Sequence, residues 1–141
     1  MSRIMRFDHV GVTVQDLDQV TAFFVGLGLE IEGRTFVEGD FIDTVIAIPD
    51  SRTEIVMLRM PDGGTGVELS SFVRPEPEPG SPAAMVNELG LRSLSFEVDD
   101  LEAHGRCHRP ARSPPRPNDR YSTRMSGAWA TYAVRKESSW P

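Results

Sequence analysis

The densest group of potential metal ligands in this sequence is the stretch "HGRCH", which supplies His104, Cys107 and His108. Imidazole nitrogens and a cysteine thiolate are ligands that zinc prefers in proteins. A closed zinc site also needs a second pair of such ligands at a short spacing, and none follows this stretch. We therefore predict no zinc site here. The stretches "PDGG" and "GLGLE" lack the spacing of a phosphate-binding loop and are predicted to be a turn and a helix cap.

The segment that contains "HGRCH", residues 104–141, differs in composition from the rest of the chain. It holds 8 Lys/Arg against 2 Asp/Glu (net charge +6), whereas residues 1–103 hold 7 against 19 (net charge −12). It also contains 5 prolines, and Val134 is its only residue among Ile, Leu, Val and Phe. Such a segment buries too little apolar surface to offset its ordering entropy, so we predict a poorly ordered tail. A basic tail can bind nucleic acid, but we predict no such role for this one.

The composition of the whole chain is that of an ordinary single globular domain. The 141 residues are 39% hydrophobic and 26% charged, and this length is enough for a hydrophobic core. No apolar run reaches the roughly 18–20 residues that cross a bilayer, so we predict no membrane span. The single cysteine excludes an intrachain disulfide framework and fits a reducing compartment. With no signal-like N-terminus, we expect a cytoplasmic protein.

The elements that would position a site are clearest in residues 5–73. Alternating valines predict a strand over residues 5–14, and Asp16 can cap a helix that ends at Gly28. A second strand is predicted at Leu29–Phe36. The next predicted strands are two β-branched runs, Asp43–Ile48 and Thr53–Met60, split by the turn "PDSR", and then "GVELSSFV". The predicted order is β-α-β-β-β, with an extra bend in the third strand.

A second copy of this unit begins after the Pro- and Glu-rich residues 74–90, which are predicted to be a linker. With an offset of 84, Asp16 and Leu17 fall on the identical residues Asp100 and Leu101. The strand valines Val10, Val12 and Val14 fall on Leu94, Phe96 and Val98. Because a short strand-to-helix phrase can also recur by chance, the surrounding alternation and the linker decide the interpretation. We predict a duplicated module that starts again at residues 91–103.

Residues 5–103 resemble the vicinal oxygen chelate superfamily of glyoxalase I, bleomycin-resistance and extradiol dioxygenase proteins. The resemblance rests on "FDHVGVTVQDLDQVTAFFVGLGLEIEGR", "TEIVMLRMPDGGTGVELSSFVRP" and "LGLRSLSFEVDDLEA" in this order. It implies an α+β fold of two paired βαβββ modules around a cleft. The first module is complete in the sequence, and the second is expected to be truncated after its first strand.

The tail departs from this family pattern after Ala103. Similar proteins continue with a helix and three strands that end in a phrase such as "W-R-M-x-Y-V-R-G-P-E-G-I-I-V-x-L". The codons for "MSGAWATYAVRKESSWP", read two nucleotides out of step, permit "V-W-R-M-G-Y-V-R-G-P-E-G-I-I-V-A". We therefore hypothesise that the residues from about 104 onward are a frameshifted translation of the second module. Even this corrected ending puts alanine where the family's carboxylate usually sits.

The resemblance also implies a site for a divalent metal on the inner strands. His9 matches the histidine of the first strand, and Glu68 in "GVELS" matches the carboxylate of the last strand. Together they could bind iron, manganese, nickel or zinc, with Glu68 as the catalytic base. The repeat aligns His9 with Ser93, a poor ligand, and catalytic metals normally hold at least three protein ligands. Alternatively, His9 is a locally hydrogen-bonded strand residue and Glu68 an ordinary strand carboxylate facing solvent or pairing with an arginine.

Two functional classes follow, together with a third outcome. The first is a glyoxalase- or dioxygenase-type enzyme, a lyase, isomerase or dioxygenase that acts on a small oxygenated metabolite through the metal. The second is a non-catalytic protein that sequesters a small molecule, as bleomycin-resistance proteins do; the third is an inactive frameshifted product. Phe41, Met57 and Phe72 are candidates to line the cleft. An incomplete second module leaves open strand edges and apolar surface, so we expect a homodimer.

Overall fold

The computed structural model describes residues 2–80, 87, 89–91, 93–97, 121–125 and 128–133. The chain divides into two compact units, Met1–Pro79 and Gly80–Pro141. The division falls inside the Pro- and Glu-rich segment 74–90. In the described part of the chain, no helix is long and apolar enough to cross a membrane.

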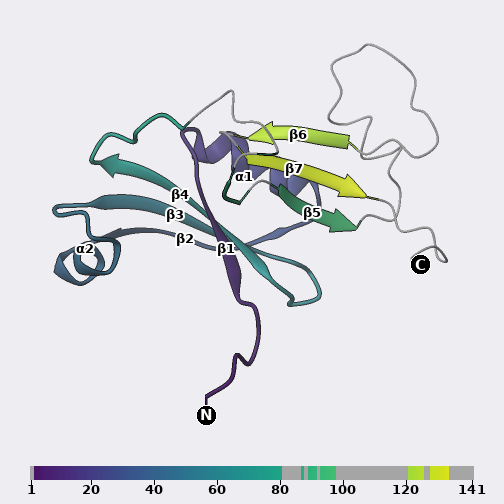
Figure 1. Cartoon of the computed structure of the whole chain (residues 1–141), viewed down its shortest axis with the longest axis horizontal. Helices are drawn as coiled ribbons and strands as arrows, with labels where there is room; N and C mark the ends of the chain where they lie inside the picture. The colour runs from purple at the N-terminus through teal and green to yellow at the C-terminus, as the bar shows by residue number, and fades with distance from the viewer. Residues whose placement is uncertain are drawn as a thin grey trace. The chain divides into compact units, whose positions relative to one another are not determined.

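The first unit is a four-stranded mixed sheet with two helices (Figure 1). The sheet order is β1-β4-β3-β2, in which β1 runs parallel to β4 and the other neighbours are antiparallel. The elements are, in chain order, β1 (His9–Thr13), α1 (Leu17–Gly26), β2 (Glu30–Glu38), α2 (Asp40–Ile46), β3 (Arg52–Arg59) and β4 (Gly66–Arg74). The α+β class predicted from the sequence is confirmed.

Helix α1 begins and ends as its sequence predicts. The Asp16 carboxylate accepts a hydrogen bond from the amide of Gln19 at 2.8 Å, which satisfies one free donor of the first turn. At the other end Gly28 adopts a φ of +99°, a left-handed conformation that favours glycine. Within the helix, Leu17 and Phe24 are buried. The helix contacts β3 and β4, so its apolar side faces the sheet.

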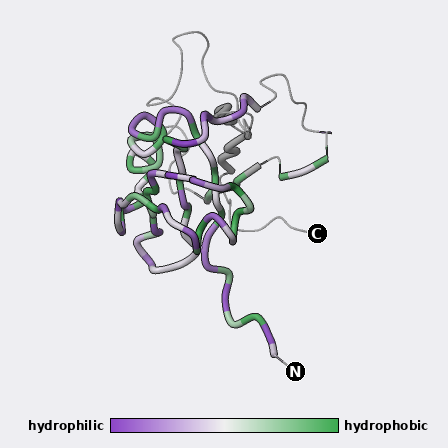
Figure 2. The backbone as a smooth tube through the Cα atoms, turned by 90° about the vertical axis from the view of Figure 1, so that its left-hand side faces the viewer, coloured by the Kyte–Doolittle hydropathy of each residue, from purple (hydrophilic) through white to green (hydrophobic). Residues whose placement is uncertain are grey.

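The hydrophobic core lies between α1 and one face of this sheet. Val56, Leu58 and Leu69 are completely buried there, together with Phe24 from the helix. Because successive strand side chains point to opposite faces, the residues between them on β3 and β4 are only partly buried. Figure 2 shows hydrophilic and hydrophobic stretches interspersed along the coloured part of the chain. The sheet therefore has a core face and a second face that carries polar groups.

The strand predicted at Asp43–Ile48 is wrong, because the chain forms helix α2 at Asp40–Ile46 instead. A short apolar run cannot be assigned to strand or helix from periodicity alone. The deciding contacts come from Asp43, whose carboxylate accepts hydrogen bonds from the amides of Asp50 and Ser51 and from the Ser51 hydroxyl. These bonds tie the middle of α2 to the two residues that precede β3. The helix has no buried residue, and Phe41 is 82% exposed.

The second unit contains a three-stranded sheet formed by β5 (Ser93–Glu97), β6 (Tyr121–Met125) and β7 (Ala128–Ala133). Its order is β5-β7-β6, with β5 parallel to β7 and β6 antiparallel to β7. This is the arrangement of β1, β4 and β3 in the first unit. The sequence analysis predicted β5 but neither β6 nor β7, since the tail is poor in the apolar residues that mark strands. The predicted helix start at Asp100 lies outside the described residues.

Candidate functional site

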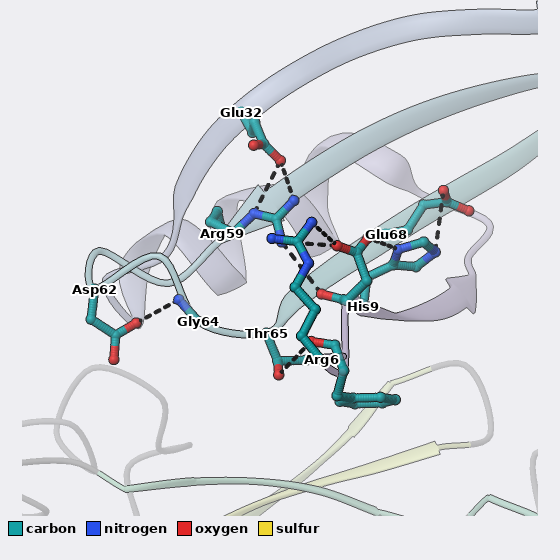
Figure 3. Close-up of polar contacts among 10 residues, drawn as sticks. Arg6, His9, Glu32, Arg59, Asp62, Gly64, Thr65 and Glu68 are labelled. Carbon is teal, nitrogen blue, oxygen red and sulfur yellow. Dashed lines mark hydrogen bonds and ion pairs between the residues drawn. The ribbon is translucent and has the colours of Figure 1, made fainter. Parts of the chain in front are cut away.

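His9 and Glu68 lie together on the face of the first sheet that is opposite the core (Figure 3). In the parallel pairing of β1 with β4, His9 is opposite Gly66 and Gly11 is opposite Glu68. Side chains two residues apart share a face, so both point to the same side. His9 Nε2 and Glu68 Oε2 are 3.8 Å apart, with side chains 37% and 28% exposed. The structure thus brings the two predicted site residues into one accessible pair.

The surface around this pair is polar. The hydroxyls of Thr13 and Ser70 lie 3.2 Å apart further along the same two strands. Gly11 leaves space beside the carboxylate, because a Cβ there would lie 4.0 Å from Glu68 Oε1. We call the surface formed by His9, Gly11, Thr13, Glu68 and Ser70 the polar face. It offers hydrogen-bonding groups of both kinds to a ligand.

The three residues predicted to line a cleft, Phe41, Met57 and Phe72, lie in different parts of the first unit. Met57 is paired with Glu68 across β3 and β4, and is therefore on the side of the polar face. Phe72 follows Ser70 by two residues on β4, which places it on the same side. Phe41 is on α2, outside the sheet. Two of the three predicted residues therefore border the polar face.

His9 is held from the side that faces away from Glu68. Its Nδ1 lies 2.9 Å from Asp8 Oδ2, and the other oxygen of Asp8 accepts a hydrogen bond from Arg6 at 2.6 Å. The hydrogen bond with His9, followed by the charges of Arg6 and Arg59, lowers the pKa of Asp8 below its ordinary value. The prediction that His9 is locally hydrogen-bonded thus describes one of its ring nitrogens, while the other faces Glu68.

Among the described residues, Glu68 lies beside His9, with Oε2 3.8 Å from Nε2, rather than beside an arginine. The arginine of this region, Arg59, instead donates two hydrogen bonds to Glu32 Oε2, at 2.8 and 3.1 Å. At this end of the sheet Glu32 is therefore bound by Arg59, and Glu68 lies beside His9 (Figure 3). Glu68 keeps its place on the polar face beside His9.

The pair fits part of a metal site. An imidazole nitrogen and a carboxylate oxygen are suitable donors for zinc and similar cations, and two tetrahedral ligands of one ion lie about 3.4 Å apart. The observed 3.8 Å needs only a small side-chain adjustment. Among the residues that the structure describes, no group of three or more His, Cys, Asp or Glu could hold a metal. The described part of this chain supplies two donors.

The second sheet does not repeat this donor pair. Ser93 begins β5 as His9 begins β1, and it is paired with Trp129 of β7. Counting two residues on from that partner, as from Gly66 to Glu68, leads to Thr131. A serine and a threonine thus occupy the register positions that correspond to His9 and Glu68. The sequence repeat anticipated Ser93 but gave no signal for Thr131.

Sequence analysis missed the residues that surround His9. Asp8 is adjacent to it in the sequence, so the dipeptide "DH" was a signal that could have been used. Arg59 and Glu32 come from distant strands, and no spacing in the sequence pointed to them. The other candidate ligands, His104, Cys107 and His108, lie outside the described residues.

Comparisons with known proteins agree with this architecture. A family profile described as "Glyoxalase/Bleomycin resistance protein/Dioxygenase superfamily" matches residues 8–109. A solved glyoxalase family protein from Bacillus cereus is 29% identical with a TM-score of 0.80, over 94% of this chain and 95% of that one. A protein from the mobile metagenome of V. Pseudocholerae is 17% identical with a TM-score of 0.51, over 97% and 99% of the two chains, and shares the fold alone. No curated protein matches the sequence significantly.

Proposed function

Because the chain belongs to the glyoxalase/bleomycin resistance protein/dioxygenase superfamily, we propose that it binds a small oxygenated metabolite on the polar face of its first sheet. A divalent cation held by His9 and Glu68 would anchor this ligand, in the manner of the lyases, isomerases and dioxygenases of the superfamily. The observation that carries the proposal is the 3.8 Å approach of His9 Nε2 to Glu68 Oε2 on an accessible surface.

Each group on the polar face has a role in this proposal. His9 and Glu68 would hold the cation, which when bound stabilises negative charge that develops on a substrate oxygen. The Glu68 carboxylate has a second oxygen that can accept a proton from the substrate, which makes Glu68 the candidate general base. The hydroxyls of Thr13 and Ser70 can both donate and accept hydrogen bonds, and would orient a ligand's oxygen atoms.

The remaining ligands of the cation must come from elsewhere, because two protein ligands are fewer than catalytic sites hold. A substrate with two adjacent oxygens can supply two, and a second copy of the chain can supply another His9 and Glu68. We propose a homodimer, which the exposed apolar side chains of the first unit support: Phe36 is 49%, Val45 63% and Phe41 82% exposed. Light scattering after size exclusion should give twice the chain mass; a compact monomer would argue against the dimer.

Metal titration with the purified protein tests the cation proposal. Binding of Mn²⁺, Ni²⁺ or Zn²⁺ is measured by calorimetry, with the metal content per chain determined afterwards. We expect Glu68→Gln to weaken metal binding at least about 10-fold, because it removes the carboxylate, which is one of the two proposed protein ligands. The matched control is Glu30→Gln, which removes the same charge from β2. One ion per chain indicates a site within each chain, with its remaining positions open to water or substrate, and one ion per two chains indicates a shared site. An equal loss in the control would contradict the assignment.

A non-catalytic binding protein is the second candidate, and one observation favours it. Ser93 and Thr131 occupy the register positions that correspond to His9 and Glu68, so the second sheet offers no matching donors there. A protein that only sequesters a ligand needs no metal of its own. Absence of metal binding in the titration, together with a retained ligand-binding polar face, would make this the preferred function.

We propose a cytoplasmic location for the protein. The chain contains one cysteine, and proteins of oxidising compartments commonly rely on disulfides. Cell fractionation of the native host, followed by immunodetection, tests this; recovery in a secreted or membrane fraction would contradict it.

A further inference from the structure

Asp8 occupies a position between the proposed ligand His9 and a pair of arginines. It directly precedes β1, and its two carboxylate oxygens have different partners. Oδ2 lies 2.9 Å from His9 Nδ1, and Oδ1 lies 2.6 Å from Arg6 Nη2. The carboxylate is therefore oriented from one side by Arg6 and presents its second oxygen to the imidazole ring.

Arg59 fixes the backbone of Asp8 from two strands away. Its Nη1 donates to the Asp8 carbonyl at 3.3 Å and lies 3.9 Å from Asp8 Oδ1, while Nε and Nη2 are held by Glu32. To reach Asp8 from β3 the guanidinium passes Gly66, where a Cβ would lie 3.4 Å from Nη1 and 2.8 Å from the Leu58 carbonyl oxygen. The glycine thus leaves room for this crossing, and the planar fork of arginine gives it a defined direction.

The chemistry of the contact decides which nitrogen of His9 carries the proton. An ionised carboxylate can only accept hydrogen bonds, so Nδ1 must donate to Asp8. In a neutral imidazole the other nitrogen, Nε2, then has a free lone pair. This is the atom 3.8 Å from Glu68 Oε2. Histidines that bind metals commonly donate their second N–H to a carboxylate in this way.

We infer that Asp8 is a positioning residue that fixes the Nδ1–H tautomer of His9 and directs the Nε2 lone pair towards the polar face, with Arg59 and Glu32 holding Asp8 in place. This inference rests on the proposed function in one respect, namely that His9 is the residue that meets the cation or ligand. Asp8 itself touches neither in this arrangement.

The tautomer can be measured on the metal-free, full-length protein by long-range ¹H–¹⁵N NMR correlation at pH 8, where an ordinary imidazole is neutral. The His9→Gln variant assigns the His9 signals among the three histidines of the chain. We expect the Nδ1–H pattern in the wild type and a shift towards Nε2–H in Asp8→Ala. Asp8→Asn retains an oxygen acceptor and should restore much of the wild-type pattern. Asp40→Ala, which removes the same charge from α2, should change nothing.

Three results would overturn the inference: an Nε2–H tautomer in the wild type, a doubly protonated ring at that pH, or an unchanged pattern in Asp8→Ala. If Asp8→Ala does not fold, the tautomer patterns of the wild type and of Asp8→Asn still test the positioning role. In the metal titration, Asp8→Ala should lower affinity about 10–100-fold.

The positioning role of Asp8 and the cation site can be contradicted independently of each other. A tautomer shift in Asp8→Ala without any metal binding in the wild type would sustain the positioning role and contradict the cation. Metal binding that depends on His9, combined with an unchanged tautomer in Asp8→Ala, would sustain the cation and contradict the positioning role.

Discussion

The two units of this chain share a strand arrangement but differ in what stabilises it. In the first unit, β3 and β4 have 8 and 9 residues, and helix α1 covers one face of the sheet with a buried Phe24. In the second unit, β5, β6 and β7 have 5, 5 and 6 residues. The same order and directions of strands therefore form in the second unit with shorter strands and fewer paired residues.

The two units also carry different residue types at equivalent positions of the same strand arrangement. The parallel pair β1 and β4 carries His9 and Glu68, and the parallel pair β5 and β7 carries Ser93 and Thr131 at the same register positions. The register is thus repeated, and at these positions the first copy has an imidazole and a carboxylate suited to a divalent cation, whereas the second has a serine and a threonine.

The largest expected effect concerns the origin of the second unit. We propose that the codons after about residue 103 are read out of frame, because the shifted codons of "MSGAWATYAVRKESSWP" permit a typical family ending. Resequencing the natural gene should show an insertion or deletion near this point, and the intact mass of its product should differ from that of the printed sequence. An uninterrupted reading frame with a matching mass would contradict the proposal.

Truncation of one core residue in each unit should show the difference in packing. Leu58→Ala removes a completely buried side chain and should lower the free energy of unfolding by about 2–5 kcal/mol. Leu94→Ala, on the partly buried β5, should cost about 1 kcal/mol or less, because less apolar area leaves water. Urea denaturation followed by circular dichroism measures both. Equal losses would show that the second sheet has a core of similar quality.

Asp16 and its equivalent in the sequence repeat, Asp100, offer a smaller, matched comparison. Asp16→Ala removes the hydrogen bond to the Gln19 amide and should cost about 1 kcal/mol. Asp100 is its equivalent in the repeat, and the sequence that follows it reaches Gly105 and Pro110, which disfavour a helix interior, within ten residues. Asp100→Ala should therefore leave the denaturation midpoint nearly unchanged. A comparable loss would indicate that a capped helix follows β5 as well.

The smallest effect is expected on the stability of the first unit at acidic pH. Hydrogen bonds from Ser51 and Asp50 lower the pKa of Asp43 below 3.8. The native state therefore releases this proton more readily, and its stabilisation is present above about pH 4 and lost as the pH falls through the folded pKa. Asp43→Asn should destabilise the protein at pH 6 and differ less from the wild type at pH 3. A difference independent of pH in urea titrations would contradict this linkage.

Much of the first unit could be predicted from the sequence, and the reasons are local. Alternating valines, the Asp16 cap and Gly28 act over neighbouring residues, so β1 and α1 were predicted at nearly their observed positions. Helix α2 was not, because its conformation depends on hydrogen bonds between Asp43 and Ser51, eight residues apart. Strands β6 and β7 depend on backbone pairing, which leaves little trace in side-chain composition.

Some residues of the candidate site could likewise be predicted from the sequence, and others could not. The family resemblance led to His9 and Glu68, and the parallel register of β1 and β4 brings them together. The ion pair of Arg59 with Glu32 spans two strands, and its reach to Asp8 crosses a third. Such a contact follows from the sheet order and has no signature in the linear sequence.

The position of β1 at one edge of the first sheet connects assembly with ligand binding. Within the described part of the first unit, β1 pairs with β4 on one side, and an edge strand of this kind presents backbone groups to which a further strand can add. The strand that presents this open edge begins at His9. A strand that docked there would pair with the strand that carries the proposed ligand His9, and any coupling between docking and ligand occupancy would change the affinity of each by the same factor.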